Sequence, residues 1–339
     1  MRQISAITKR QVDLISVAEV AAGTTFSILL AGMFGLKYSA VAGITTLLTI
    51  QNTRGATLKT TGKRMVAFAL MVALCAATLL PLQFHTLSFG LFLLLFVGLC
   101  YLLDLQSVIA SSAVLATHFL MERSMAPDLI INELGLLLTG SGVGVLVKLI
   151  IPRRRAPLTR FRDDIENAFK AILQAMAGKT IHTLTDAEDP DRLNSFDRLE
   201  KMLADYENAA LFESDNHLLG EGKYPVAYFQ MRSRQATFLR RIWQNLSRTG
   251  QSHGTNFLLA DFFKEVADGF SEGNTALHML QTLERIDHVY DRLPLPLDRK
   301  EFEDRALLYA VIQDMRSLLQ IKRDFFLSAN EDGLQAKWQ

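Results

Sequence analysis

The sequence predicts an all-α protein in two parts: a transmembrane domain of about six helices over residues 1–152, and a cytoplasmic helical domain over residues 153–339. Charge distribution is the first observation behind this division. The first 152 residues contain 10 basic residues (Lys and Arg) and 6 acidic residues (Asp and Glu). The other 187 residues contain 26 basic and 29 acidic residues, as is typical of a soluble domain. The second is the join itself, "LIIPRRRAP", where an apolar run meets Pro152 and three arginines. A chain of 339 residues is long enough for two domains of ordinary size.

Six apolar segments predict the membrane helices. A span needs roughly 20 mostly apolar residues, because about 30 Å of hydrocarbon is crossed at about 1.5 Å per helical residue. Six such segments in succession, with few charges between them, favour a membrane domain over a large soluble core. The segments lie near residues 17–36, 38–57, 65–82, 86–103, 105–121 and 129–151.

Basic residues indicate the orientation of these segments, because Lys and Arg collect on the cytoplasmic side of a membrane protein. Six spans place every basic cluster on one side, so we expect a multi-pass protein of the bacterial inner membrane with both termini in the cytoplasm. Asp13 and Glu19 interrupt any signal-peptide core, so we expect the N-terminus to be retained. The clusters are Arg2, Lys9 and Arg10 at the N-terminus, Lys59, Lys63 and Arg64 after the second span, and Arg153–Arg155 after the sixth.

The second segment is short, and its length directs attention to Arg54. From Tyr38 to Ile50 the apolar run covers only about 20 Å of helix, so a spanning helix has to continue through Gln51, Asn52 and Thr53 to Arg54. The forked guanidinium would then lie near the cytoplasmic mouth, where it suits a carboxylate. Arg54 and Asn52 are therefore candidate substrate-binding residues. The alternative is that Arg54 extends to lipid phosphates.

Ionisable residues inside membrane segments are candidates for proton coupling. Glu19 and Glu133 lie a few residues inside the first and sixth segments, and each either exchanges a proton or marks a helix end. Asp104 lies between the fourth and fifth segments, where it either couples protons or caps a turn. Lys148 is a further ionisable residue of the sixth segment, and we expect His118 to be interfacial.

The glycine-rich stretch "LLTGSGVGVLVKL" contains Gly140, Gly142 and Gly144. A nucleotide-binding loop would require a preceding strand, but the stretch lies within a candidate span. Small residues at close spacing let membrane helices approach one another, so we predict a packing role.

Residue patterns exclude most other chemistry. Cys75 and Cys100 lie in apolar runs and indicate no disulfide or metal framework. The acidic residues of 186–191 lack the spacing of a calcium loop, and the histidines show no zinc-binding arrangement. No Walker motif, nucleophile–base set or nucleic-acid module is present. We therefore expect no enzyme activity, no cofactor, no metal and no nucleic-acid partner.

The second half shows helical periodicity throughout. We expect helices near 158–180, 190–214, 224–249, 256–271 and 274–292, and a last helix whose apolar residues recur every three or four positions. Two prolines in "LPLPLD" forbid a continuous helix there. Asp298 and Glu301 then fit a capping box for the last helix.

Two stretches resemble the bacterial aromatic acid exporter family, which is related to the fusaric acid resistance transporters. "LPLPLDRKEFEDRALLYAVIQDMRSLLQIKRDFF" is similar to the end of that family's C-terminal domain, and "QNTRGATLKTTGKR" resembles its basic segment after the second span. The resemblance covers essentially the whole chain and implies export of aromatic carboxylates. The matching positions are Arg299, Glu301, Phe302, Glu303, Arg305 and Ala306 in the first stretch, and Arg54, Gly62 and Arg64 in the second.

Two functions therefore compete. The first is a proton-coupled exporter of aromatic or other organic acids, with the lipid bilayer and a small organic acid as partners. The second is a membrane-anchored scaffold or sensor whose cytoplasmic helices bind a partner protein. The charged residues inside the membrane segments distinguish the two functions, because a simple membrane anchor does not need them. Six short spans are few to enclose a solute path, so we expect a two-fold homodimer.

Overall fold

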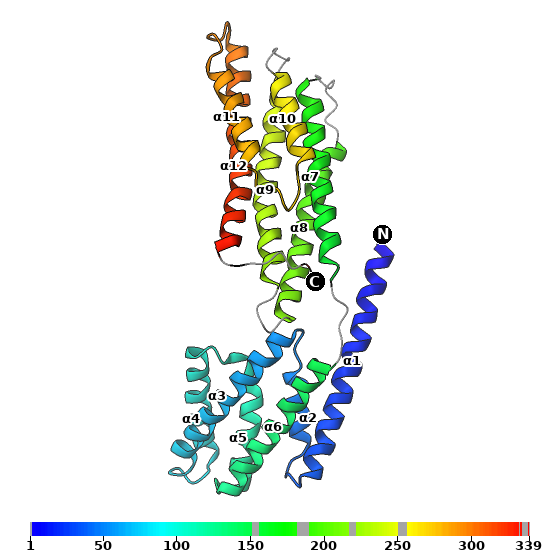
Figure 1. The fold of residues 1–339 in the computed structure, drawn as a ribbon. Coiled ribbons are helices and arrows are strands. Elements are labelled where there is room, and N and C mark those ends of the chain that lie inside the picture. Colours follow the sequence, from blue (N-terminus) through cyan, green and yellow to red (C-terminus); the bar gives the residue numbers. More distant parts are fainter. Residues whose placement is uncertain are drawn as a thin grey trace. The chain divides into compact units, whose positions relative to one another are not determined.

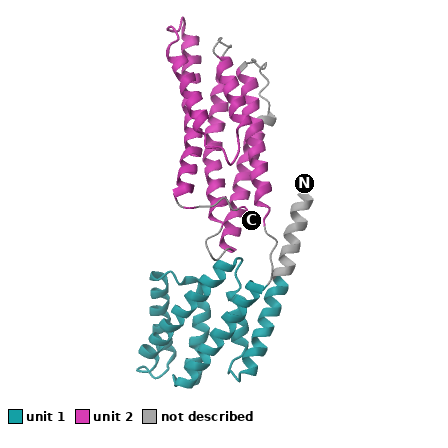
Figure 2. Cartoon of the chain, in the orientation of Figure 1, with its two compact units in different colours: residues 1–154 teal, residues 155–339 magenta. Residues whose placement is uncertain are grey.

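The computed structural model divides the chain into two compact units, residues 1–154 and 155–339, which are described separately (Figure 2). It describes residues 17–150, 156–180, 194–216, 222–249, 256–331, 333 and 338 in full, and only the backbone of residues 2–16, 181 and 190–193. The side chains of the N-terminal basic cluster, the cluster Arg153–Arg155 and the acidic residues of 186–191 lie outside the fully described ranges. The described residues form twelve α-helices and one 3-10 turn and contain no strand, which confirms the all-α prediction.

Unit 1 contains six α-helices (Figure 1). Two of them, α3 and α6, are long and apolar enough to cross a membrane, and three shorter apolar helices cover Val17–Met33, Ala40–Thr49 and Thr86–Leu102. Six membrane crossings therefore stay a prediction. The helices are α1 (Arg2–Met33), α2 (Ala40–Thr49), α3 (Arg54–Leu79), α4 (Thr86–Leu102), α5 (Ile109–Glu122) and α6 (Pro127–Ile150), with a 3-10 turn at Gln106–Val108.

The boundary between the second and third helices differs from the prediction. Helix α2 ends at Thr49 and does not continue to Arg54, because Ile50 is already extended. The side chain of Thr53 then accepts a hydrogen bond from the backbone N–H of Ala56, which starts α3 at Arg54. The expected basic loop is therefore helical, and Lys59, Lys63 and Arg64 lie on the first three turns of α3. The prediction missed these turns because hydropathy identifies only the apolar part of a helix, and the first three turns of α3 are polar.

The segment from Lys37 to Arg54, which contains α2, nevertheless lies along most of α6. The backbone N–H of Lys37 donates to the side chain of Asn132 at 2.8 Å, and Arg54 contacts the carbonyl of Lys148 at 3.1 Å. Residues 37–54 thus run beside α6 from Asn132 to Lys148, sixteen helical steps or about 24 Å. The non-helical ends of this segment lie against protein, where irregular backbone is tolerated at membrane depth.

Glycines bring α2 and α6 into close contact, as predicted for the glycine-rich stretch. A Cβ at Gly140 would lie 2.5 Å from the carbonyl oxygen of Ala42, and one at Gly144 would lie 2.9 Å from the Thr49 side chain. The hydroxyl of Thr46 donates to the carbonyl of Gly140 at 2.9 Å. Gly142 faces open space. Two of the three glycines therefore pack within the chain.

The surface of unit 1 is apolar and its interior contains charged groups. Leu87, Leu94 and Ile150 are each more than 70% exposed (88%, 72% and 73%). A protein in water rarely exposes so many large apolar side chains. The pattern therefore indicates that the surface of unit 1 faces an apolar medium such as lipid. The buried polar side chains include Glu19, Arg64, His118, Glu133 and Lys148.

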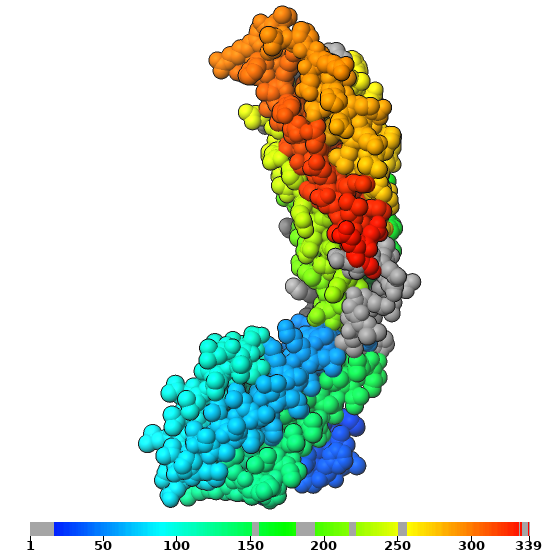
Figure 3. Space-filling view, turned by 60° about the vertical axis from the view of Figure 1, so that its left-hand side comes forward, coloured from blue at the N-terminus to red at the C-terminus, as the bar shows by residue number. Residues whose placement is uncertain are grey.

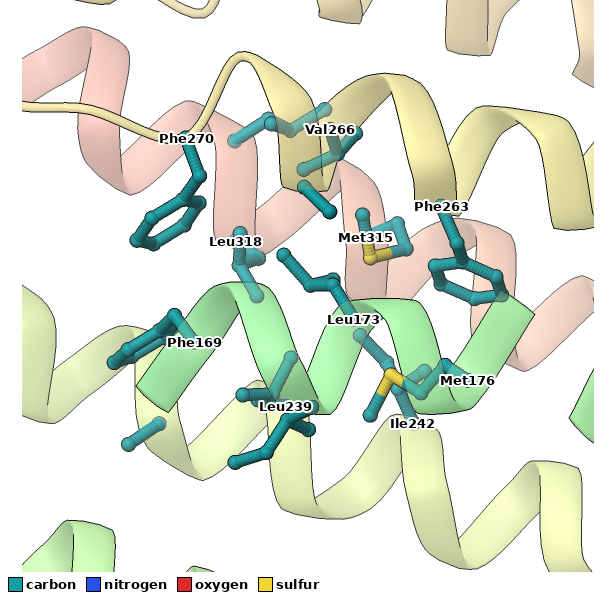
Figure 4. Close-up of a cluster of buried hydrophobic side chains, with 14 of the residues drawn as sticks. Phe169, Leu173, Met176, Leu239, Ile242, Phe263, Val266, Phe270, Met315 and Leu318 are labelled. Atoms are coloured by element: carbon teal, nitrogen blue, oxygen red, sulfur yellow. The ribbon is translucent and has the colours of Figure 1, made fainter. Parts of the chain in front are cut away.

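Unit 2 is a bundle with an ordinary apolar core. Side chains of α7, α9, α10 and α12 meet in its centre, where Leu173, Leu239 and Met315 are fully buried (Figure 4). Its helices are α7 (Leu158–Ile181), α8 (Pro190–Asn216), α9 (Lys223–Arg248), α10 (Asn256–Asp268), α11 (Leu277–Asp291) and α12 (Arg299–Glu331).

The stretch that resembles the exporter family forms a capped turn before α12. Asp298 accepts a hydrogen bond from the backbone N–H of Glu301 at 2.8 Å, and the Glu301 carboxylate accepts one from Leu297 at 2.7 Å. Arg305 pairs with Glu301 and donates to the carbonyl of Pro294. The capping prediction is confirmed, and these residues hold the proline-containing segment against the helix.

Candidate functional site

Helix α6 carries ionisable groups near both of its ends. Glu133 lies in its second turn and Lys148 in its last, fifteen residues apart and therefore separated by about 22 Å along the axis. Each forms a buried contact with a different helix. Helix α6 therefore takes part in two separate ion-pair groups, and the sequence candidates Glu19 and Glu133 belong to different ones.

Glu133 pairs with a histidine. Its Oε2 lies 2.7 Å from Nδ1 of His118 on α5, and its Oε1 accepts a hydrogen bond from the Asn132 amide at 3.1 Å. Glu133 is fully buried and His118 is 5% exposed. A carboxylate and an imidazole are the side chains that proteins most often use to accept and pass on protons.

The environment of this pair comes from the turn before α2. The ring of Tyr38 stacks on His118 with centroids 4.1 Å apart, and its hydroxyl donates to Glu122 at 2.9 Å. Lys37 lies 3.6 Å from the same carboxylate. Glu122 and Lys37 are both exposed, so the contact of Tyr38 with Glu122 extends from the buried His118–Glu133 pair to the surface of the unit.

His118 was expected to be interfacial, and the structure buries its side chain between α5, α6 and the turn before α2. Its position could have been found from helical spacing, since Ser111, Leu115 and His118 are buried at intervals of four and three. Its partner, however, is fifteen residues away on another helix, and no local pattern identifies such a contact.

The opposite end of α6 forms a buried ion pair. Nζ of Lys148 lies 2.9 Å from Oε2 of Glu19 on α1, and the two side chains are 6% and 5% exposed. A charge buried at this depth is stable only with a partner. Glu19 is therefore engaged in an ion pair in this conformation.

Arg54 holds the end of α6 rather than facing an open mouth. Its Nε and Nη2 donate to the carbonyls of Lys148 and Leu149, each at 3.1 Å. These carbonyls belong to the last turn of the helix, which lacks intrahelical partners. Asn52 lies exposed in the preceding turn. The structure thus places both predicted substrate residues at the α2–α3 junction.

Asp104 lies at the surface. Its carboxylate accepts a hydrogen bond from Lys63 at 2.7 Å, and its side chain is 80% exposed. Its backbone adopts a left-handed conformation with φ of 56°, as in a tight turn. Asp104 thus lies in a turn and pairs with Lys63, and it belongs to neither buried pair.

Arg64 is a buried residue whose burial sequence reasoning did not foresee. It is 1% exposed, and its Nε and Nη1 have no hydrogen-bond partner among the residues that the structure describes. The signal in the sequence is its position one turn before Phe68, on the same face of α3.

Comparisons with known proteins agree with the resemblance in sequence. The family model "Aromatic acid exporter family member 1" matches residues 15–151, and "Putative aromatic acid exporter C-terminal domain" matches residues 156–323. A relative in Bacillus subtilis (strain 168), "Uncharacterized protein YqjA", is 28% identical over 307 residues, which cover 91% of this chain and 94% of the relative.

A solved structure also aligns with part of the chain. "Crystal structure of putative membrane protein from Clostridium difficile 630" has a TM-score of 0.44 and 16% identity, and the match covers 50% of this chain and 99% of that one. The two family models together extend over both units. The chain belongs to the aromatic acid exporter family.

Proposed function

We propose that this protein exports aromatic or other organic acids across the bacterial inner membrane and uses the proton gradient to do so. The observation that carries the proposal is the buried His118–Glu133 pair inside a bundle with an apolar surface. Family membership supports the class of function, since the family is named for aromatic acid export.

A proton-exchanging role for the pair follows from its surroundings. The polar groups that face it are Tyr38 and Asn132, and Glu122 and Lys37 lie beyond them. Helix α4 has no charged residue, and those of α3 lie in its first three turns, at the Arg54 end. The pair joins α5 to α6, so a change in its charge during transport would alter the contact between these two helices.

The proposed topology has six crossings with both termini in the cytoplasm. The end of unit 1 that holds Arg54, Lys59 and Lys63 would face the cytoplasm, in agreement with the distribution of basic residues. A cysteine at Lys201, an exposed position of α8, should then resist impermeant maleimides in intact cells and react after permeabilisation. Labelling in intact cells would exclude this orientation.

Uptake into inverted membrane vesicles tests export directly. Energised vesicles that contain the protein should accumulate radiolabelled benzoate faster than vesicles without it, and an uncoupler should abolish the difference. Uptake that persists with the uncoupler would exclude proton coupling. Absence of protein-dependent uptake for benzoate, 4-hydroxybenzoate and phenylacetate alike would count against an aromatic acid exporter.

Two matched variants locate the proton step. Glu133→Gln should abolish uncoupler-sensitive uptake while protein level stays normal. Asp128→Asn, an exposed carboxylate near the start of the same helix, should behave as wild type. Equal activity of both variants would remove Glu133 from the mechanism.

A further inference from the structure

Arg64 lies on the buried face of α3 and has no anionic partner among the residues that the structure describes. Thr57, Arg64, Phe68, Met71 and Cys75 follow one another at intervals of seven, four, three and four residues, which places them on one side of the helix. The guanidinium nitrogens Nε and Nη1 are buried without a hydrogen-bond partner in the described part of the chain.

Other buried cations in the molecule are compensated. Lys148 pairs with Glu19 at 2.9 Å, and Arg232 in unit 2 donates to the side chains of Tyr228 and Gln235 at 3.0 and 2.8 Å. A buried charge without such partners is strongly unfavourable. An arginine that extends to lipid phosphates keeps its guanidinium at the surface, whereas Arg64 is 1% exposed. Neither an ion pair within the chain nor contact with lipid phosphates therefore accounts for the position of Arg64.

Arg64 lies near the turn between α4 and α5, because the preceding residue, Lys63, pairs with Asp104 in that turn. Helices α3 and α6 run side by side in opposite directions (Figure 1, Figure 3). Arg64 is ten residues beyond Arg54, which contacts Lys148, so it lies about 15 Å along α3 from that contact.

We propose that Arg64 binds the carboxylate of the transported acid. A guanidinium offers paired donors that match the two oxygens of a carboxylate. Phe68 and Met71, one and two turns further along the same face, provide apolar surface for an aromatic ring. The site is enclosed in this conformation, so the acid reaches it only when α3 and α6 separate, as alternating access requires. This inference rests on the proposed function.

Ligand-dependent thermal unfolding of the purified full-length protein tests the site. Cys75 and Cys100, the two cysteines of the chain, are both buried in unit 1, so a fluorogenic maleimide reports the unfolding of that unit. Benzoate should raise the unfolding midpoint of the wild-type protein. Benzamide, which has nearly the same shape and no charge, should not.

Three variants identify the group that binds. Arg64→Gln should lose the benzoate shift, and its midpoint without ligand should equal or exceed that of the wild type, because an uncompensated buried charge is removed. Arg64→Lys should bind benzoate at least about tenfold more weakly, since an ammonium lacks the fork. Lys59→Gln, an exposed cation on the same helix, should keep the full shift.

Several results would overturn the inference: no benzoate shift in the wild type, a full shift in Arg64→Gln, or a lower midpoint of that variant without ligand. A shift caused by short-chain phosphatidylglycerol and not by benzoate would assign the site to lipid headgroups and would also overturn it. If benzoate binds through Arg64 but vesicles take up no acid, the proposed export function fails and the site remains.

Discussion

Glu19 and Lys148 form a buried ion pair of 2.9 Å between α1 and α6, although 129 residues separate them in the sequence. Removal of one partner leaves an uncompensated buried charge, which typically costs about 3–5 kcal/mol. Glu19→Gln and Lys148→Met should each lower the unfolding midpoint measured by maleimide labelling. The double variant should recover much of the loss. Equal destabilisation of the single and double variants would contradict a pairwise interaction.

Close packing of α2 on α6 makes Gly140 intolerant of any side chain. A Cβ there would lie 2.5 Å from a backbone carbonyl oxygen, which cannot move without moving α2. Gly140→Ala should therefore destabilise unit 1 by about 1–3 kcal/mol, a typical cost of overpacking. Gly142→Ala is the matched control, since no atom lies within 4 Å of its Cβ position. Equal midpoints for the two variants would refute the contact.

Substitution of Arg54 should lower the stability of unit 1 and leave substrate affinity unchanged. Its two hydrogen bonds to carbonyls of α6 predict that Arg54→Ala destabilises unit 1 by about 1–3 kcal/mol. Arg54→Lys, with a single ammonium for two carbonyls, should be intermediate. Benzoate affinity should be unchanged in both variants. A large loss of affinity with unchanged stability would instead support Arg54 as the substrate residue.

Lys322 should make the stability of unit 2 depend on pH. Burial lowers the pKa of Lys322 to about 8; the charge of Arg232 acts in the same direction, whereas Glu272 and Glu166 oppose it. Between pH 8 and 10 the unfolded chain binds more protons than the folded one, so the free energy of unfolding rises with pH. The full difference from 10.5 corresponds to about 3 kcal/mol, an upper bound. Above pH 10 the raised pKa of Tyr228 acts in the opposite sense.

Tryptophan fluorescence measures this effect in the intact protein, because Trp243 and Trp338 both belong to unit 2. Urea unfolding of the wild type should show the rise between pH 8 and 10. Lys322→Met should remove it, and Lys264→Met, a change at an exposed lysine, should keep it. An unchanged slope in Lys322→Met would assign the pH dependence to another group.

The sequence was sufficient for features that depend on composition or local spacing. Helical class, the apolar segments of unit 1, the cap of Asp298 before α12 and the packing role of Gly140 and Gly144 all follow from such patterns. The end of α2 at Thr49 did not, because a polar segment that continues a helix and one that interrupts it have the same hydropathy.

The candidate site was less predictable, since its contacts join distant residues. Glu133 was identified as an ionisable group in an apolar segment, but its partner depends on how α5 and α6 meet. Arg54 and Arg64 look alike in sequence, and only the fold shows that Arg54 contacts two carbonyls while Arg64 is enclosed.

The glycine contacts between α2 and α6 also determine how unit 1 can deform. Helices α1, α2 and α6 pack closely with one another, as α3, α4 and α5 do. At Gly140 the backbones of α2 and α6 meet without a layer of side chains between them. We therefore expect α2 and α6 to move together when unit 1 changes conformation. Such a change would have to break the His118–Glu133 contact with α5 or the Arg54 contact with α3 if either helix moved away from α6.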